Sequence, residues 1–125
     1  METIRRQHFE TEINELYGKT CDEIIAVAKN DNPEVVILMY IQVDKIWHRL
    51  YLDAGALFWH EGMKPDEEED IFDDENYFDL GIQQGFKGKK FSLIQWKDSK
   101  FTIRFENNRG LQMIEKGDET IMKIL

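Results

Sequence analysis

The chain of 125 residues contains one cysteine, two prolines and no long apolar run, and each shortage excludes something. Because Cys21 is alone, no internal disulfide can form, and nothing in the chain requires an oxidising compartment. A membrane-spanning helix needs about 18 or more consecutive apolar residues, whereas the longest apolar stretch is VVILMYIQV at residues 35–43. The N-terminal residues METIRRQHFETEINEL lack the apolar centre of a secretory signal. We therefore expect a cytoplasmic protein with no membrane partner.

The sequence also lacks the motifs that usually indicate catalysis or metal binding. It has no HxH, HExxH or CxxC pattern for zinc and no GxSxG pattern for a serine nucleophile. The GKT at residues 18–20 fails as a phosphate-binding loop, because residue 13 is isoleucine where the first glycine should be. A calcium loop needs glycine at its sixth position, which neither a start at Asp66 nor one at Asp70 provides. We expect no catalytic residues, no metal site and no cofactor.

Acidic residues are plentiful, and they gather in one segment. Residues 61–79 contain ten acids and a single base, Lys64, so they carry the whole net charge of −9, and the remainder of the chain is neutral. We call residues 61–80 the acidic segment. Its field repels nucleic-acid phosphates and anionic membranes and attracts basic surfaces, whose association it accelerates. We expect a basic protein partner and no nucleic acid.

Hydrophobic periodicity predicts an α+β fold. Residues 3–17 place Phe9, Ile13, Leu16 and Tyr17 at helical spacing, which indicates an amphipathic helix ended by Gly18. Residues 22–29 fit either a helix capped by Thr20 or a strand, and we prefer the strand.

From residue 35 onward the period changes to two, which is typical of strands. Separated by turn residues, the predicted strands cover residues 35–43, 46–52, 56–61, 91–96, 101–106, 111–115 and 120–125. We expect one domain, residues 1–125, with an N-terminal helix packed on a bent, mainly antiparallel sheet of six or seven strands that ends in a C-terminal meander. The acidic segment is then an insertion at residues 61–80.

Two groups of side chains suit protein recognition. Trp47, Arg49 and Tyr51 share one face of the predicted strand 46–52, and these residue types dominate interface hot spots. His48 lies on the other, apolar face, where a buried structural histidine is the simpler interpretation. In the acidic segment, Ile71, Phe72, Tyr77 and Phe78 interrupt the charges, either to anchor it to the sheet or to contact a partner. The predicted partner-binding residues are Asp66, Glu67, Glu68, Glu69, Asp70, Asp73, Asp74, Glu75, Tyr77, Trp47, Arg49 and Tyr51.

The segment DEEEDIFDDENYFDL, the small size, the acidity and the missing catalytic motifs together resemble bacterial toxin-immunity proteins of the contact-dependent inhibition type. The resemblance implies a non-catalytic protein, a monomer or weak homodimer, that binds a cognate toxin one to one and blocks it, the toxin often being a basic nuclease. The alternative is a small ligand-binding protein or enzyme that uses the Trp47, Arg49 and Tyr51 face, with His48, Asp53 or His60 nearby.

Overall fold

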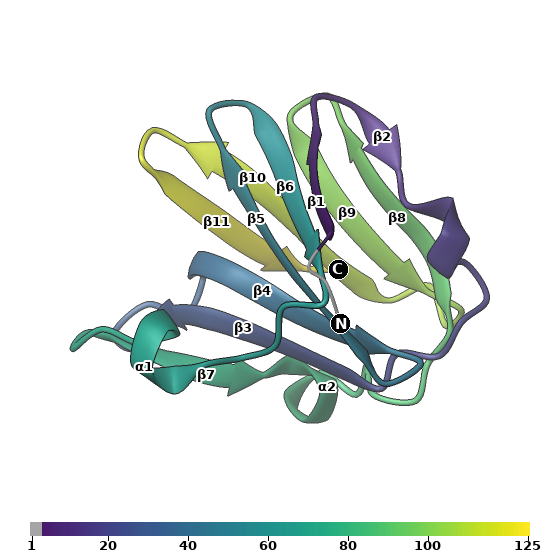
Figure 1. The fold of residues 1–125 in the computed structure, drawn as a ribbon, viewed down its shortest axis with the longest axis horizontal. Helices are drawn as coiled ribbons and strands as arrows, with labels where there is room; N and C mark the ends of the chain where they lie inside the picture. Colours follow the sequence, from purple (N-terminus) through teal and green to yellow (C-terminus); the bar gives the residue numbers. More distant parts are fainter. Residues whose placement is uncertain (1–3) are drawn as a thin grey trace.

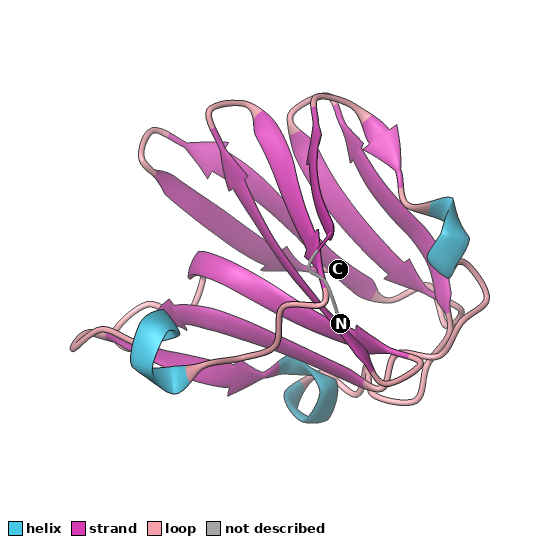
Figure 2. Cartoon of the chain, in the orientation of Figure 1, coloured by secondary structure: helices cyan, strands magenta, loops and turns pink. Residues whose placement is uncertain are grey.

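The computed structural model describes residues 4–125, which form one antiparallel sheet of eleven strands with little helix (Figures 1 and 2). The strands are β1 (Ile4–His8), β2 (Thr11–Glu12), β3 (Glu23–Lys29), β4 (Val35–Val43), β5 (Ile46–Asp53), β6 (Ala56–Glu61), β7 (Glu75–Asp79), β8 (Phe91–Lys97), β9 (Lys100–Phe105), β10 (Gly110–Lys116) and β11 (Glu119–Ile124). The helical elements are one 3₁₀ turn, η1 (Asn14–Leu16), and two short helices, α1 (Glu67–Asp70) and α2 (Leu80–Gln83).

The sheet branches at β4. One edge of β4 pairs with β3, which pairs in turn with β7. The opposite edge is shared, because Val35 and Val36 pair with β11 whereas Met39–Val43 pair with β5. One branch continues from β5 through β6 to β1, and the other runs from β11 through β10, β9 and β8 to β2.

The two branches curve toward each other and enclose a nearly closed barrel. They meet where β1 and β2 follow each other along the chain, yet within the described residues no backbone ladder joins these two strands. We call this gap the seam. Tight hairpins shape the rest of the barrel: Asp44–Lys45, Ala54–Gly55 and Asp98–Ser99 have positive φ at both turn positions. That is the type I′ geometry, which matches the twist of paired strands.

The interior of the barrel is the hydrophobic core. Alternate residues of each strand point inward, so Met39 of β4, Leu50 of β5 and Trp59 of β6 are buried together with Ile103 and Met113 from the other branch. The opposite side chains of β3 to β7 form an outer face, and this face positions the acidic segment.

The predicted helix over residues 3–17 is wrong, and the α+β class is wrong with it. Residues 4–17 form β1, β2 and η1, while Thr3 lies outside the described residues. Ile13 and Leu16 are buried, but Phe9 lies in the β1–β2 turn with 73% of its surface exposed. The helical spacing gave the wrong prediction because the edge of β6 determines the structure here. β1 pairs with this edge and satisfies backbone donors and acceptors that would otherwise be unpaired.

The strand predictions agree with the structure more closely than the helix prediction does. The seven strands expected from alternation are present within a residue or two of their predicted ends, and residues 22–29 contain the strand β3. The short strands β1, β2 and β7 were not predicted. In the part of the chain that the structure describes, no helix has both the length and the apolar character needed to cross a membrane.

Gly110 is required where β10 passes β9. A Cβ atom at this position would overlap the backbone carbonyl oxygen of Ile103 and approach Arg104 Cα to 2.9 Å. Because backbone atoms cannot yield as side chains can, we expect Gly110→Ala to lower the unfolding free energy by about 3 kcal/mol, the upper part of the usual range for overpacking. Urea denaturation measures this loss.

The control for this variant is Gln112→Ala on the same strand. It removes one hydrogen bond, from Gln112 Nε2 to Thr102 Oγ1 at 3.1 Å, and should cost about 1 kcal/mol. Equal losses in the two variants would contradict the steric argument.

Candidate protein-binding surface

The acidic segment leaves β6 and crosses the outer face of the sheet. Its first fixed point is Gly62, whose backbone N–H donates to the carbonyl of Trp47 at 2.7 Å. Asp66 then caps α1, because its side chain accepts a hydrogen bond from the Glu68 N–H at 3.1 Å. The chain returns along the edge of β3 as β7.

Asp70, at the end of α1, holds the segment onto the sheet. Its carboxylate accepts hydrogen bonds from the hydroxyls of Tyr40 on β4 at 2.8 and 2.9 Å and of Tyr77 on β7 at 2.7 Å. It also accepts the Asp66 backbone N–H at 2.8 Å. Asp70 is only 5% exposed. We call Asp70, Tyr40 and Tyr77 the Asp70 cluster, and it joins one helix to two strands.

Both tyrosines of this cluster keep their protons. Burial, followed by the hydrogen bond to Asp70, raises the pKa of Tyr40 above its usual range, and the nearby Arg49 guanidinium only partly opposes this. Burial and then the same carboxylate raise the pKa of Tyr77. Both hydroxyls therefore remain donors across the physiological pH range.

A second anchor lies where the segment enters β7. Glu75, 8% exposed, accepts the Phe72 N–H at 3.3 Å, and Lys29 Nζ lies 3.9 Å from its other oxygen. Lys29 also donates to Asp74 at 2.7 Å. This hydrogen bond raises the pKa of Lys29 and lowers the pKa of Asp74. An exposed pair of this kind contributes little stability, but it neutralises part of the charge of Asp74.

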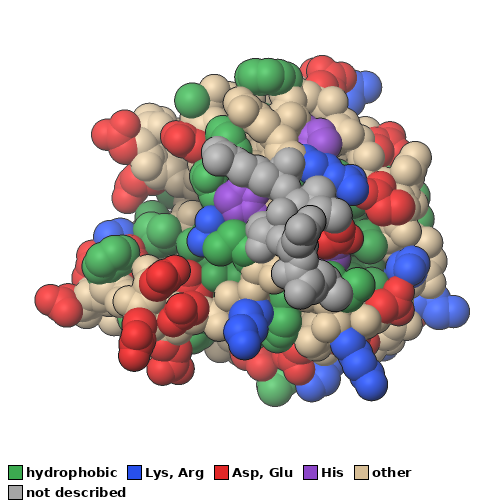
Figure 3. All heavy atoms as spheres, viewed as in Figure 1, with side chains coloured by type: hydrophobic (Ala, Val, Ile, Leu, Met, Phe, Trp, Pro, Cys, Tyr) green, Lys and Arg blue, Asp and Glu red, His purple; other side chains and the backbone are tan. Residues whose placement is uncertain are grey.

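Burial therefore divides the predicted acidic residues into two kinds. Asp70 and Glu75 were expected to meet a partner, but their buried side chains instead hold the segment in place. The other six are exposed: Asp66, Glu67, Glu68, Glu69, Asp73 and Asp74. Figure 3 shows acidic side chains gathered over the part of the molecule where Figure 1 places α1.

From the sequence, the apolar residues of the segment were expected either to anchor it to the sheet or to be exposed for contact with a partner, and the structure contains both arrangements. Phe78 packs against the hydrophobic core, and Tyr77 belongs to the Asp70 cluster. Phe72, in contrast, is 68% exposed among the acids. The segment is thus anchored and also presents one aromatic side chain.

Trp47, Arg49 and Tyr51 lie along the outer face of β5, each partly exposed. The Tyr51 ring stacks on Phe58 at 5.0 Å between ring centres. Arg49 contacts His60 Nδ1 at 3.0 Å, and its guanidinium carbon lies 5.9 Å from the centre of the Tyr51 ring. These contacts orient the side chains without burying them completely.

The Asp70 cluster brings the two predicted groups together. Tyr40 is the direct cross-strand neighbour of Arg49 and packs edge-on against Trp47, with ring centres 6.2 Å apart. A recess of about 480 Å³ lies between Tyr40 and Arg49 on the sheet and residues 63–70 of the acidic segment. The acids of α1 therefore adjoin the aromatic face of β5 at this recess.

This geometry gives less support to the alternative of a small-molecule site than to a protein-binding surface. Of the polar groups proposed for it, Arg49 alone is among the described residues that line the recess. His48 points into the barrel and Asp53 lies at the exposed end of β5. Burial raises the pKa of the Cys21 thiol to about 12, so Cys21 is a poor nucleophile. Residues 4–125 contain no group of three or more His, Cys, Asp or Glu side chains suited to a metal ion.

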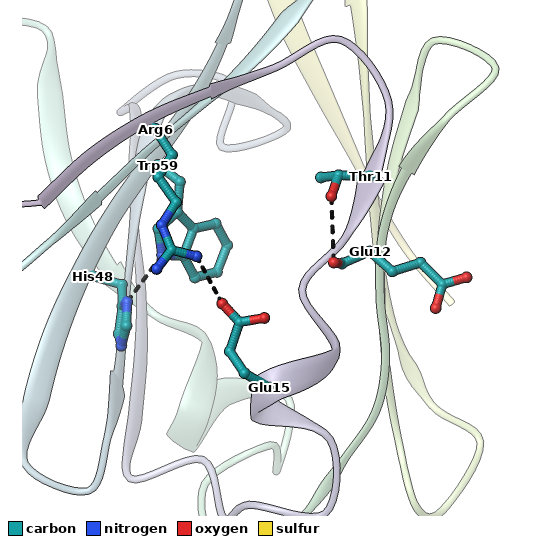
Figure 4. Close-up of polar contacts among 6 residues, drawn as sticks. All are labelled: Arg6, Thr11, Glu12, Glu15, His48 and Trp59. Carbon is teal, nitrogen blue, oxygen red and sulfur yellow. Dashed lines mark hydrogen bonds and ion pairs between the residues drawn. The ribbon is translucent and has the colours of Figure 1, made fainter.

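His48 belongs to a polar cluster beside the seam (Figure 4). Its Nδ1 accepts the indole N–H of Trp59 at 2.9 Å, while Arg6 of β1 donates to Glu15 of η1 at 2.8 Å. The cavity at this cluster measures about 20 Å³, enough for a single water. His48 is thus buried and hydrogen-bonded, in agreement with the prediction from the sequence.

Sequence reasoning missed Tyr40, on which the whole surface depends. Tyr40 is the single hydroxyl in the apolar run VVILMYIQV, and a buried hydroxyl needs a hydrogen-bond partner. That signal indicates an unseen polar contact, although it does not say with which residue.

Protein-family models, curated proteins and solved structures offer no match to this chain. Its function is therefore inferred from the charge and geometry of this surface.

Replacing Asp70 tests whether the cluster fixes the segment. Asp70→Ala leaves two tyrosine hydroxyls and the Asp66 N–H without their acceptor. We expect the unfolding free energy to fall by about 3 kcal/mol, and the Asp66 amide to exchange with solvent much faster than in the parent chain. The exposed neighbour variant Glu69→Ala should change neither quantity measurably. If the Asp66 amide stays protected in Asp70→Ala, other contacts hold the segment.

The stability of the fold should fall at acidic pH because of His48. Burial first, and the Arg6 charge to a lesser extent, lower its pKa, although Glu61 and Glu15 oppose them. The unfolded chain therefore binds this proton more readily than the folded one, so the contribution of His48 is complete above about pH 6.5 and is lost as the pH falls below it.

Urea denaturation at pH 7.5 and pH 5 measures this loss. The variant His48→Gln, which keeps an acceptor for Trp59 but does not titrate, should lose less stability between the two pH values than the parent chain. The same loss in both proteins would assign the pH dependence to other groups.

Proposed function

We propose that this chain is a non-catalytic binding protein that masks a basic protein partner. One observation carries the proposal: the Asp70 cluster holds the exposed acids of α1 beside a recess that Arg49 also lines. Tyr40 of the same cluster packs against the partly exposed Trp47. Aromatic and arginine side chains dominate interface energetics, and charged rims guide the partner to them. A recess at their boundary suits the insertion of a partner side chain.

The electrostatics favour a protein over other ligands. The acidic segment carries the net charge of −9, so it repels phosphates and attracts cationic surfaces over distances near the Debye length. Because buried hydrogen bonds fix the segment, little order has to be gained on binding, and less of the interaction energy is lost to conformational entropy.

The partner that fits best is a cationic toxin domain, which makes the chain an immunity protein. A nuclease is a good candidate, because a cleft that binds nucleic acid must present lysine and arginine to phosphates. A surface of fixed carboxylates offers that cleft a substitute for the phosphates. This proposal includes one-to-one binding in the cytoplasm by a monomer or weak homodimer.

The proposed contact residues follow from exposure. They are the six exposed acids, Asp66, Glu67, Glu68, Glu69, Asp73 and Asp74, with Tyr77, Trp47, Arg49 and Tyr51. Asp70 and Glu75 position this set. The test variant should therefore change exposed acids and leave both buried carboxylates intact.

The test is the triple variant Glu67→Gln, Glu68→Gln, Glu69→Gln, measured by stopped flow against a basic partner, such as a toxin encoded next to this chain. We expect association at low salt to slow at least tenfold, because these charges steer the encounter. The difference between the variant and the parent chain should shrink as added salt screens the charges.

The matched control removes three charges elsewhere. Asp98→Asn, Asp118→Asn and Glu119→Gln change exposed acids at the β8–β9 and β10–β11 hairpins. Their combined effect on the association rate should be small. If the two triple variants slow association equally, overall charge and not this surface guides the partner, and the proposed site is incorrect.

A further inference from the structure

β7 is an edge strand whose outer side has no partner among the described residues. It pairs only with β3, through all five of its residues. Figure 1 shows it at the border of the molecule, beyond β3, with no strand along its other side. An edge strand exposes backbone donors and acceptors on which another strand can add.

The register identifies the backbone groups on the free edge of β7. The N–H of Asn30 donates to the carbonyl of Asp74 at 2.8 Å, so Asp74 and every second residue after it face β3. The peptide groups of Glu75, Tyr77 and Asp79 consequently point away from β3, toward the free edge.

Two of the backbone N–H groups on this edge donate hydrogen bonds to nearby groups of the same chain, where a neighbouring strand would otherwise accept them. The Glu75 N–H donates to the Phe72 carbonyl at 3.0 Å, within the turn that precedes the strand. The Tyr77 N–H donates to the side-chain oxygen of exposed Asn76 at 2.9 Å. Asn76 Oδ1 thus takes the place of an acceptor that a neighbouring strand would supply, and an exposed side-chain amide is easily displaced.

We infer that an extended basic segment of the partner adds to β7 as a further strand. This inference rests on the proposed function and specifies how the partner binds. Exposed acids lie at the start of β7 (Asp73) and over the outer face (Glu67–Glu69), where they meet the lysines or arginines of the added strand. Exposed Phe72 offers an apolar contact at the same end.

Charge excludes a second copy of the chain as the occupant. Pairing two β7 strands edge to edge would bring two acidic segments together, each with the full net charge of −9, and like charges across an interface are strongly unfavourable. A cationic strand reverses the sign of that interaction.

The binding test uses peptides as probes with the intact protein. The first peptide alternates lysine and valine over about eight residues, enough to cover the strand. The second has the same sequence with every backbone amide N-methylated, which retains the charge and removes the donors. The third alternates glutamate and valine. Fluorescence anisotropy measures affinity, and amide exchange at Tyr77 and Asp79 locates the site.

Strand addition predicts that only the first peptide binds well. Its N-methylated form should bind at least tenfold more weakly, and the glutamate peptide should not bind. If the two lysine peptides bind equally, charge alone attracts them; strand addition is then overturned while the proposed function stands. If the first peptide fails to bind, or protects amides away from β7, strand addition is also overturned.

A pair of variants tests the same edge from the protein side. Tyr77→Ala removes the side chain whose hydroxyl contacts Asp70, whereas Tyr77→Pro removes the same aromatic side chain and also the outward N–H, which β3 does not use. Proline is tolerated at such edge positions. With both variants folded by circular dichroism, the lysine peptide should bind Tyr77→Pro at least tenfold more weakly than Tyr77→Ala. Equal affinities would overturn the inference, and the N-methylated peptide decides independently if Tyr77→Pro does not fold.

Discussion

The buried carboxylate of Asp70 is the constraint on which the arrangement of the surface depends. A carboxylate loses much hydration when it is buried, and it is tolerated here because two tyrosine hydroxyls and a backbone N–H replace the lost water. The same contacts fix α1 against the sheet. Without them α1 would lose this attachment to the sheet and its defined position beside Arg49.

The branched sheet makes this arrangement possible. β4 contributes inward side chains such as Met39 to the core and outward Tyr40 to the Asp70 cluster, so one strand connects the interior to the surface. β3 and β7 extend the sheet beyond the barrel and provide the area over which the acidic segment lies. The scaffold therefore separates the hydrophobic core inside the barrel from the outer face that we propose for recognition.

Local sequence patterns predicted the strands whose partners follow closely along the chain. From β4 to β6 and from β8 to β11, each strand pairs with the next through a short turn, so alternation and turn residues are sufficient. The prediction for the N-terminal region was wrong because β1 pairs with β6 and β2 pairs with β8. The periodicity near residue 9 contains no information about these distant partners. The concentration of acids at residues 61–79 is plain from the sequence, but the burial of Asp70 depends on Tyr40, thirty residues away.

The seam has a consequence for how the chain folds. β1 and β2 are made before the other strands of this sheet, yet their partner β6 lies about halfway along the sequence and β8 later still. Closing such long loops is entropically slow, and contacts of high sequence separation form late in folding. β1 and β2 are thus among the last strands to dock, although they precede the others along the chain, and the barrel closes only when β8 is in place to receive β2.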